Sequence, residues 1–192
     1  MRIPLVQPAI GLDIKTLSLE YAGIGRYTIN LVHELTKRKR YSYLGFSSPR
    51  TNVELIPSDN IHISKGISSY VNSTLLRSLL LLPIQVWNQK LDIFHSMDNS
   101  IINLLPKSKC KRLSTIHDLI ALKYPEFFTR KHRTVVHNMI SYVARNADHI
   151  ITDSSSTKMD LLEFYPFLED QDISVVHLAS SDFFRKCSED QI

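Results

Sequence analysis

The chain has 192 residues, of which 43% are hydrophobic, so it can bury one sizeable core but is short for two ordinary domains. Its formal net charge of +4 at pH 7 is too small to indicate nucleic-acid binding. The two cysteines have neither CxxC spacing nor histidine neighbours arranged as ligands, which argues against a structural zinc site and favours a reducing compartment. The strongest apolar run, residues 79–84, is too short to span a bilayer, and Pro4 and Pro8 make the N-terminus a poor signal peptide. We therefore expect a cytoplasmic protein.

The first half of the chain alternates short apolar runs with helical patterns. A buried strand is predicted at residues 9–14, and a loop at residues 18–25 leads into a helix. The inner face of this helix is predicted to carry Tyr27, Leu31 and Leu35. Strands at residues 42–46 and 60–64 and a leucine-rich helix at residues 69–90, which Pro83 kinks or restarts, follow in that order.

The second half repeats the same alternation. Its strands are predicted at residues 92–96, 112–116, 149–152 and 173–176. A long helix after Pro125 is predicted to end at Asn146 in the left-handed conformation. The apolar residues predicted for its inner face are Val135, Val136, Met139, Ile140 and Val143. A last helix begins at a serine cap, Ser154, and stops before Pro166.

Continuous apolar strands that alternate with helices predict an α/β fold, with a doubly wound parallel sheet covered on both faces, as in a Rossmann-like domain. Sheets of this kind bind ligands at the carboxyl ends of their strands. The residues that follow each predicted strand are therefore the candidates for function.

A pair of glycines, Gly23 and Gly25, lies at the mouth of the first predicted helix, together with Ile24 and Arg26. Free N–H groups at a helix start, with the helix dipole behind them, suit a phosphate or diphosphate. An ordinary loop-to-helix turn explains the same glycines equally well.

A dinucleotide site would have a third glycine where this chain has Thr28, and an acidic residue after the second strand where it has Ser47 and Ser48. These differences disfavour a nicotinamide cofactor. Arg50, together with the two serines, would suit a 2′-phosphate, so an NADP-type oxidoreductase remains a minor alternative.

Polar side chains also follow three later strands. His117 and Asp118 come directly after residues 112–116, where an imidazole can donate to a sugar hydroxyl or a developing charge, and where Asp118 can orient the ring or cap the next turn. His95 occupies a similar position but is followed by residues typical of a loop. Ser154 and Ser156 begin a helix, where one serine acts as the cap and the others can reach a ligand.

Five segments in this order resemble the N-terminal half of a glycosyltransferase family 4 enzyme. They are residues 23–28; residues 93–96; residues 115–119 with 124–128; residues 147–154 with Thr157, Lys158, Asp160 and Leu161; and residues 173–178. The similarity runs from about Ala9 to Phe184. A departure stands at residues 179–182, where the family usually has a glycine-containing turn.

The resemblance implies the GT-B architecture of two Rossmann domains, in which this half binds the acceptor and a C-terminal half binds the nucleotide sugar. It implies retaining, metal-independent hexosyl transfer from a GDP- or UDP-linked sugar, without a cofactor. Residues 23–26 would then lend N–H groups to the donor diphosphate. His117, with Asp118, would form the catalytic pair that faces the transferred sugar, and His95, Ser154 and Ser156 would contact the acceptor.

The resemblance also sets the expected boundaries. Residues 1–178 are expected to form the N-terminal domain, and residues 179–192 the start of a linker or tail. The family's glutamate pair and its phosphate-binding basic residues fall in the C-terminal domain. We therefore expect the chain alone to lack transferase activity, and to work with a C-terminal Rossmann domain in cis or in trans.

The expected acceptor is a glycan or a lipid-linked glycan in polysaccharide or lipopolysaccharide assembly. Three basic runs, at residues 37–40, 107–112 and 130–133, with the leucine-rich stretch at residues 75–87, suit peripheral contact with an anionic inner-membrane face. Each basic run alone is equally typical of a solvated helix end. A non-catalytic Rossmann module that binds a partner protein is the alternative from another functional class.

Overall fold

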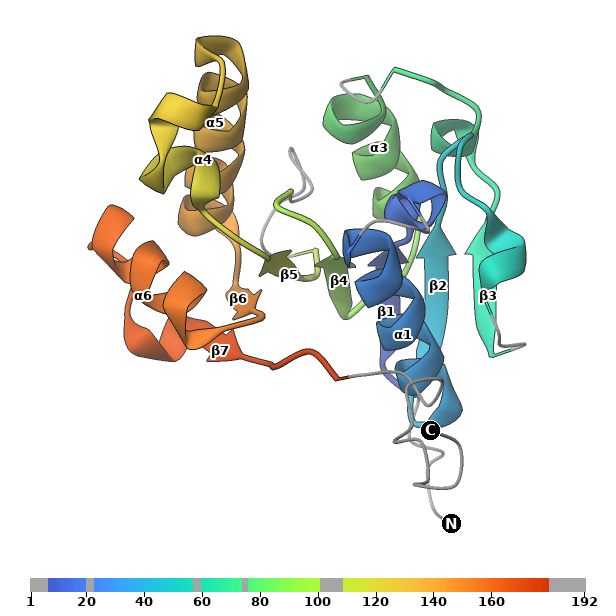
Figure 1. Ribbon diagram of the computed structural model, residues 1–192. Helices are drawn as coiled ribbons and strands as arrows, with labels where there is room; N and C mark the ends of the chain where they lie inside the picture. The colour runs from blue at the N-terminus through green and yellow to red at the C-terminus, as the bar shows by residue number, and fades with distance from the viewer. Residues whose placement is uncertain (1–6, 20–22, 57–59, 74–75, 101–108, 180–192) are drawn as a thin grey trace, which may run out of the picture.

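Seven parallel strands form one sheet in the computed structural model, which describes residues 7–19, 23–56, 60–73, 76–100 and 109–179 (Figure 1). The spatial order of the strands is β3-β2-β1-β4-β5-β6-β7. The strands are β1 (Ala9–Asp13), β2 (Ser42–Phe46), β3 (Ile61–Ser64), β4 (Ile93–Ser96), β5 (Lys111–Ile116), β6 (His149–Thr152) and β7 (Ile173–Val175). The predicted doubly wound α/β fold is confirmed, and each predicted strand begins and ends within a residue of the observed one.

Helices cover both faces of the sheet. The longer ones are α1 (Gly23–Lys37), α5 (Arg130–Asn146) and α6 (Ser155–Phe164). The shorter helical segments are η1 (Lys15–Leu19), η2 (Val53–Leu55), η3 (Ile67–Ser69), η4 (Arg77–Leu81), α3 (Leu82–Trp87), α4 (Ile120–Lys123), η5 (Pro125–Phe127) and η6 (Asp170–Asp172). In the described part of the chain, no helix is long and apolar enough to cross a membrane. The predicted tail, apart from Ala179, lies outside the described residues.

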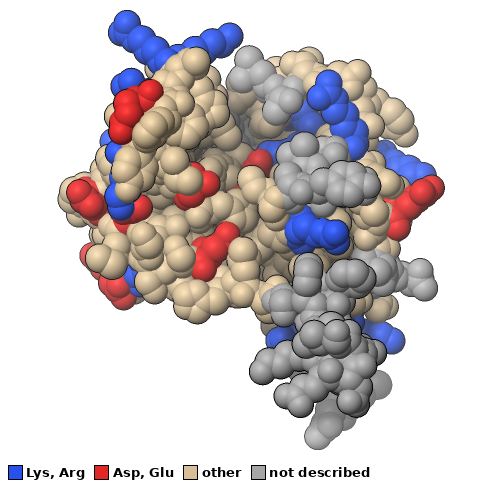
Figure 2. Space-filling view, viewed as in Figure 1, with Lys and Arg blue, Asp and Glu red and all other residues tan. Residues whose placement is uncertain are grey.

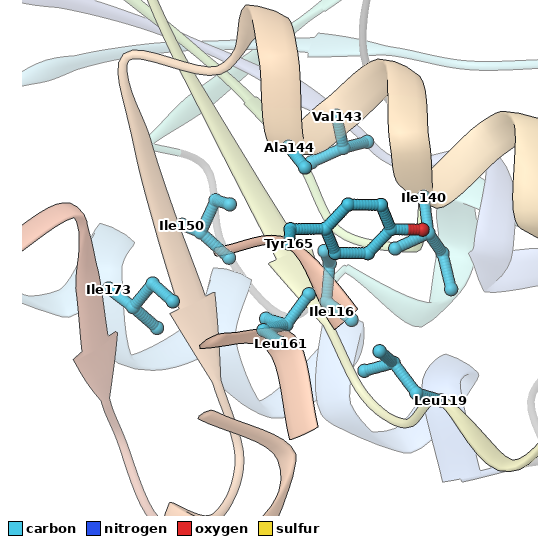
Figure 3. Close-up of a cluster of buried hydrophobic side chains, with 9 residues drawn as sticks. All are labelled: Ile116, Leu119, Ile140, Val143, Ala144, Ile150, Leu161, Tyr165 and Ile173. Carbon is cyan, nitrogen blue, oxygen red and sulfur yellow. The ribbon is translucent and has the colours of Figure 1, made fainter. Parts of the chain in front are cut away.

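The alternation of side chains along the strands decides which helix covers which face. Leu12 of β1 packs with Val32 of α1, whereas Phe94 of β4 packs with Val86 of α3 on the opposite face. Figure 3 shows the third cluster, in which side chains of α5 and α6 close over β5, β6 and β7, with Tyr165 at its centre. Burying one such aliphatic or aromatic side chain contributes about 1.5–3 kcal/mol, so this cluster holds the last three strands in place.

The buried face of α1 differs from the predicted one. Thr28, Val32 and Thr36 are its fully buried side chains, whereas Tyr27 and Leu35 pack only partly buried at its margins. Threonine can occupy this position because its hydroxyl donates to a carbonyl of its own helix: Thr28 to Ile24 at 2.9 Å, and Thr36 to Val32 at 2.8 Å.

The inner face of α5 is also narrower than predicted. Ile140 and Val143 are buried as expected, but Val135 and Met139 are exposed, because the first half of the helix extends beyond the elements that cover it. The predicted left-handed cap at Asn146 is wrong. Asn146 is the last helical residue, and its side-chain amide donates to the Tyr142 carbonyl at 2.9 Å.

The leucine-rich helix begins later than residue 69 and changes type along its length. Residues 67–69 form η3, and Arg77–Leu81 form a π-helical turn, η4, that leads into α3. Pro83 lies in the first turn of α3, which confirms the predicted new start. Pro83 has no N–H that could donate to the Leu79 carbonyl. The N–H of the preceding residue, Leu82, donates to the carbonyl of Arg77, five residues earlier, and this spacing makes the turn wider than an α-helical turn.

A buried ion pair joins this π-helical turn to the end of β1. Arg77 and Asp13 are each 2% exposed, and Arg77 Nη2 donates to Asp13 Oδ1 at 2.9 Å. The same nitrogen also donates to the Phe46 and Ser47 carbonyls at the end of β2. Burial raises the pKa of Asp13, but Lys15 and Arg77 outweigh it, so the pKa lies below its usual value. The carboxylate therefore contributes stability above the pKa of the unfolded chain, and this contribution is lost as the pH falls through the folded pKa.

Replacing Arg77 by methionine should lower the free energy of unfolding by about 3–5 kcal/mol, because it removes a principal counter-charge of the buried Asp13 carboxylate. Urea unfolding at neutral pH measures this loss. The double variant Asp13→Asn, Arg77→Met should recover much of it, since the uncompensated charge is then gone. Unchanged stability of the single variant would contradict the structural role assigned to this pair.

Candidate functional site

The polar groups of the candidate site gather at the carboxyl edge of the sheet. In parallel pairing, the ends of β1, β4, β5 and β6 meet at this edge, with Asp13 beside Ser96, and Ile116 beside Thr152. Between β1 and β4 the chain order reverses, since β1 connects to β2 on one side and β3 crosses back to β4 on the other. Ligands of doubly wound sheets bind at such a switch point.

His117 follows β5 and is held at both ring nitrogens. Its Nδ1 lies 2.5 Å from Asp153 Oδ2, and its Nε2 lies 3.1 Å from the Met97 carbonyl oxygen. Its backbone N–H donates to Asn99 Oδ1 at 3.1 Å. Both ring partners are oxygen atoms that can accept a hydrogen bond. These two contacts fix the orientation of the ring.

Asp153, which follows β6, was not predicted as a site residue. Its Oδ1 is buried and has no hydrogen-bond partner among the described residues, so its bond to His117 is the main compensation for burying this carboxylate. The predicted partner, Asp118, is elsewhere: its Oδ1 accepts from the N–H of Ile120 at 3.1 Å, at the start of α4. Of the two roles weighed for Asp118, the structure gives it the cap of the next turn.

Tyr27 connects α1 to this histidine. Its ring meets the His117 ring edge-on, with centroids 4.9 Å apart, and its hydroxyl lies 2.9 Å from Thr115 Oγ1. His95 Nε2 also lies 2.9 Å from Thr115 Oγ1. Burial raises the pKa of Tyr27 to about 12, in spite of the Thr115 bond. Burial, with His117 nearby, lowers the pKa of His95 to about 4, so both groups are neutral at pH 7.

The predicted acceptor contact at His95 lies beneath the surface. The side chain is only 4% exposed, and it faces Thr115 within the sheet. Ser154 caps α6, since its Oγ accepts from the N–H of Thr157 at 3.1 Å, whereas Ser156 is exposed in the first turn. Of the three predicted acceptor contacts, Ser156 is therefore the one whose side chain has no hydrogen bond within the described residues.

The predicted diphosphate loop forms the first turn of α1. Gly23 and Arg26 are exposed, Ile24 is half-buried and Gly25 is buried. A Cβ atom on Gly23 would meet no heavy atom within 4 Å, so there is open space beside the helix start. Tyr27 comes four residues later, roughly 6 Å along the axis, so this helix start lies about one turn from the side chain that contacts the His117 ring.

A second charge cluster at the switch point was missed by the sequence analysis. Lys15 Nζ lies 2.9 Å from Asp98 Oδ2, 2.9 Å from Ser100 Oγ and 3.5 Å from Asp13 Oδ2. Burial lowers the pKa of Lys15, but the two carboxylates outweigh it, so the pKa lies above its usual value. The signal available in the sequence was a pair of opposite charges, Asp13 and Lys15, directly after a buried strand.

Ser47 and Ser48, two of the three residues that kept the NADP alternative open, bond within the protein. Ser47 Oγ donates to Ser69 Oγ at 3.1 Å, and Ser48 Oγ lies 3.0 Å from Thr51 Oγ1. Thr28, in place of a third glycine, is buried and lies 2.7 Å from the Thr16 hydroxyl. Its side chain fills the space that close approach of a dinucleotide would need.

The sequence profile of Glycosyltransferase Family 4 matches residues 21–179. The chain belongs to this family. The matched segment contains six of the seven described strands, β2 to β7. It also contains every site residue described above that follows β4, β5 or β6. The family corresponds to the N-terminal domain of the GT-B architecture. No curated protein matches the chain. Family membership therefore supports a glycosyltransferase domain, and the carboxyl edge of its sheet holds the candidate site residues described above.

The buried His95 should make this glycosyltransferase domain sensitive to mild acid. Its folded pKa of about 4 lies below the usual 6.5, so its contribution to stability is complete above pH 6.5 and is lost as the pH falls toward 4. Between pH 7 and pH 5 this residue alone should account for roughly 2 kcal/mol of lost stability. Urea unfolding of the wild type and of His95→Gln at both pH values measures it. An equal pH dependence in the two proteins would contradict the assignment.

Proposed function

We propose that this domain is the acceptor-binding half of a retaining, metal-independent hexosyltransferase that uses a UDP- or GDP-linked sugar. The observation that carries the proposal is the contact between Tyr27 and His117. It brings the exposed start of α1 and a fixed imidazole to the same edge of the sheet. The N–H groups at the helix start suit a diphosphate, and the imidazole suits the sugar attached to that diphosphate.

In the proposed reaction, the first-turn amides of α1, at Gly23, Ile24 and Gly25, stabilise the negative charge that grows on the departing diphosphate. Removing a preorganised donor of this kind typically costs a hundredfold or more in rate. His117, held by Asp153 at Nδ1, donates to the transferred sugar from Nε2, which exchanges the Met97 carbonyl oxygen for a sugar oxygen. The Asp153 contact keeps the ring oriented while the charge develops.

The acceptor is proposed to bind over the switch point, beside β1 and β4. Lys15 and Asp98 offer charged groups of both signs there, which suits the hydroxyls of a glycan better than a strongly charged ligand. Ser156 is proposed as a further acceptor contact from α6. A glycan or lipid-linked glycan of polysaccharide or lipopolysaccharide assembly, on the cytoplasmic side, is the proposed substrate class.

A transfer assay tests the proposal. The domain, joined to or mixed with a C-terminal Rossmann domain that binds the donor, is incubated with UDP- and GDP-hexoses carrying a labelled sugar and with lipid-linked or soluble glycan acceptors. We expect transfer, and we expect His117→Ala to lower kcat/KM at least about a hundredfold. Met159→Gln, at an exposed position on α6, serves as the matched control and should retain full activity. Full activity of His117→Ala would refute the catalytic role and favour a partner-binding module.

The two carboxylates near His117 should differ in importance. Asp153→Asn removes the charge that holds the ring, so we expect kcat to fall about tenfold to a hundredfold with little change in KM. Asp118→Asn should lower kcat less, since its contact is the first turn of α4. The same transfer assay, with KM and kcat determined separately, measures both. A larger loss at Asp118 than at Asp153 would return the catalytic role to Asp118.

A further inference from the structure

The helix formed by η4 and α3 carries apolar residues on its outer face. Leu76, Leu80, Ile84 and Trp87 are each between 42% and 55% exposed. Their spacing of four, four and three residues places them along one face, where they form a continuous stripe that we call the apolar ridge. Single exposed apolar residues are ordinary on protein surfaces, but four large ones in a row mark a contact surface.

The inner face of the same helix carries polar residues beside the core residues Leu82 and Val86. Arg77 binds Asp13, as described above, and Gln85 Oε1 accepts from Ser68 Oγ at 2.5 Å. Gln85 Nε2 also donates to Ser64 Oγ at 2.7 Å. If the helix rotated so that the apolar ridge became buried, Arg77 and Gln85 would lose these partners. The buried polar contacts therefore keep the apolar ridge facing outward.

Positive charge lies near the ridge, and acidic residues are absent from its part of the sequence. Residues 60–91 contain no Asp or Glu. Lys109 Nζ lies over the Trp87 ring, 5.4 Å from its centroid, and Lys90 is exposed three residues beyond Trp87. On the same side of the sheet, Lys and Arg side chains project from the N-terminal end of α5, at the upper left of Figure 2.

We propose that the apolar ridge docks on the surface of an anionic lipid bilayer. Leucine and isoleucine side chains would enter the region between headgroups and acyl chains, as in helices that lie in the membrane plane. Trp87 would occupy the interface, which tryptophan favours. Lys90 and Lys109 would meet anionic headgroups. This inference concerns a surface outside the candidate active site, and it does not depend on the transfer reaction.

Trp87 is the only tryptophan of the chain, so its fluorescence reports on the ridge alone. Vesicles of equal parts phosphatidylcholine and phosphatidylglycerol should shift its emission to the blue, and brominated lipids in the same vesicles should quench it. Pure phosphatidylcholine vesicles should bind more weakly. No blue shift and no quenching with anionic vesicles would overturn the proposal. So would a blue shift that develops with protein concentration in the absence of vesicles, since a second copy would then cover the ridge.

A pair of variants separates the ridge from other exposed apolar residues. Leu80→Gln with Ile84→Gln should lower vesicle partitioning in a sedimentation assay by at least about tenfold. Met159→Gln, which removes an exposed apolar side chain from α6, should bind as the wild type does. Urea unfolding midpoints close to that of the wild type would show that both variants are folded. Equal vesicle binding by the ridge double variant and the wild type would refute the ridge as the docking surface.

Discussion

Parallel pairing is the constraint on which the rest of this domain depends. Because all seven strands point the same way and helices cover both faces, polar residues that follow the strands emerge together at one edge. This arrangement brings Lys15 to Asp98 and His117 to Asp153, although the members of each pair are far apart in the sequence. The register of β1, β4, β5 and β6 therefore creates the candidate site, before any loop is considered.

Charged and polar groups at this edge are stabilised by partners from other segments of the chain. Asp13 pairs with Arg77, Lys15 with Asp98, and His117 with Asp153. A charge that loses its partner in such a setting is costly, so each pair fixes the position of the segments that carry it. The result is a rigid site in which the imidazole of His117 is oriented before a substrate arrives, as electrostatic catalysis requires.

Arg77 connects the candidate site to the apolar ridge. Its guanidinium lies against the ends of β1 and β2, and its backbone belongs to the π-helical turn that leads into α3. The contact that holds Asp13 at the site therefore also sets the rotation of the helix that carries Leu80 and Trp87. If the ridge rests on a bilayer, the carboxyl edge of β1 takes a fixed orientation relative to that bilayer, which suits an acceptor attached to lipid.

The sequence by itself determined the strands and their order along the chain, because short continuous apolar runs are typical of buried parallel strands. It also placed His117 at a strand end and the two glycines at the start of a helix. Only the tertiary structure decided that the His117 imidazole is held by Asp153 and not by Asp118, its neighbour in the sequence, because the contact with Asp153 depends on the pairing of β5 with β6. Likewise, Thr28 became a core residue and Leu80 a surface residue. Helical periodicity identifies a face, but internal hydrogen bonds and the buried Arg77 decide which face is turned inward.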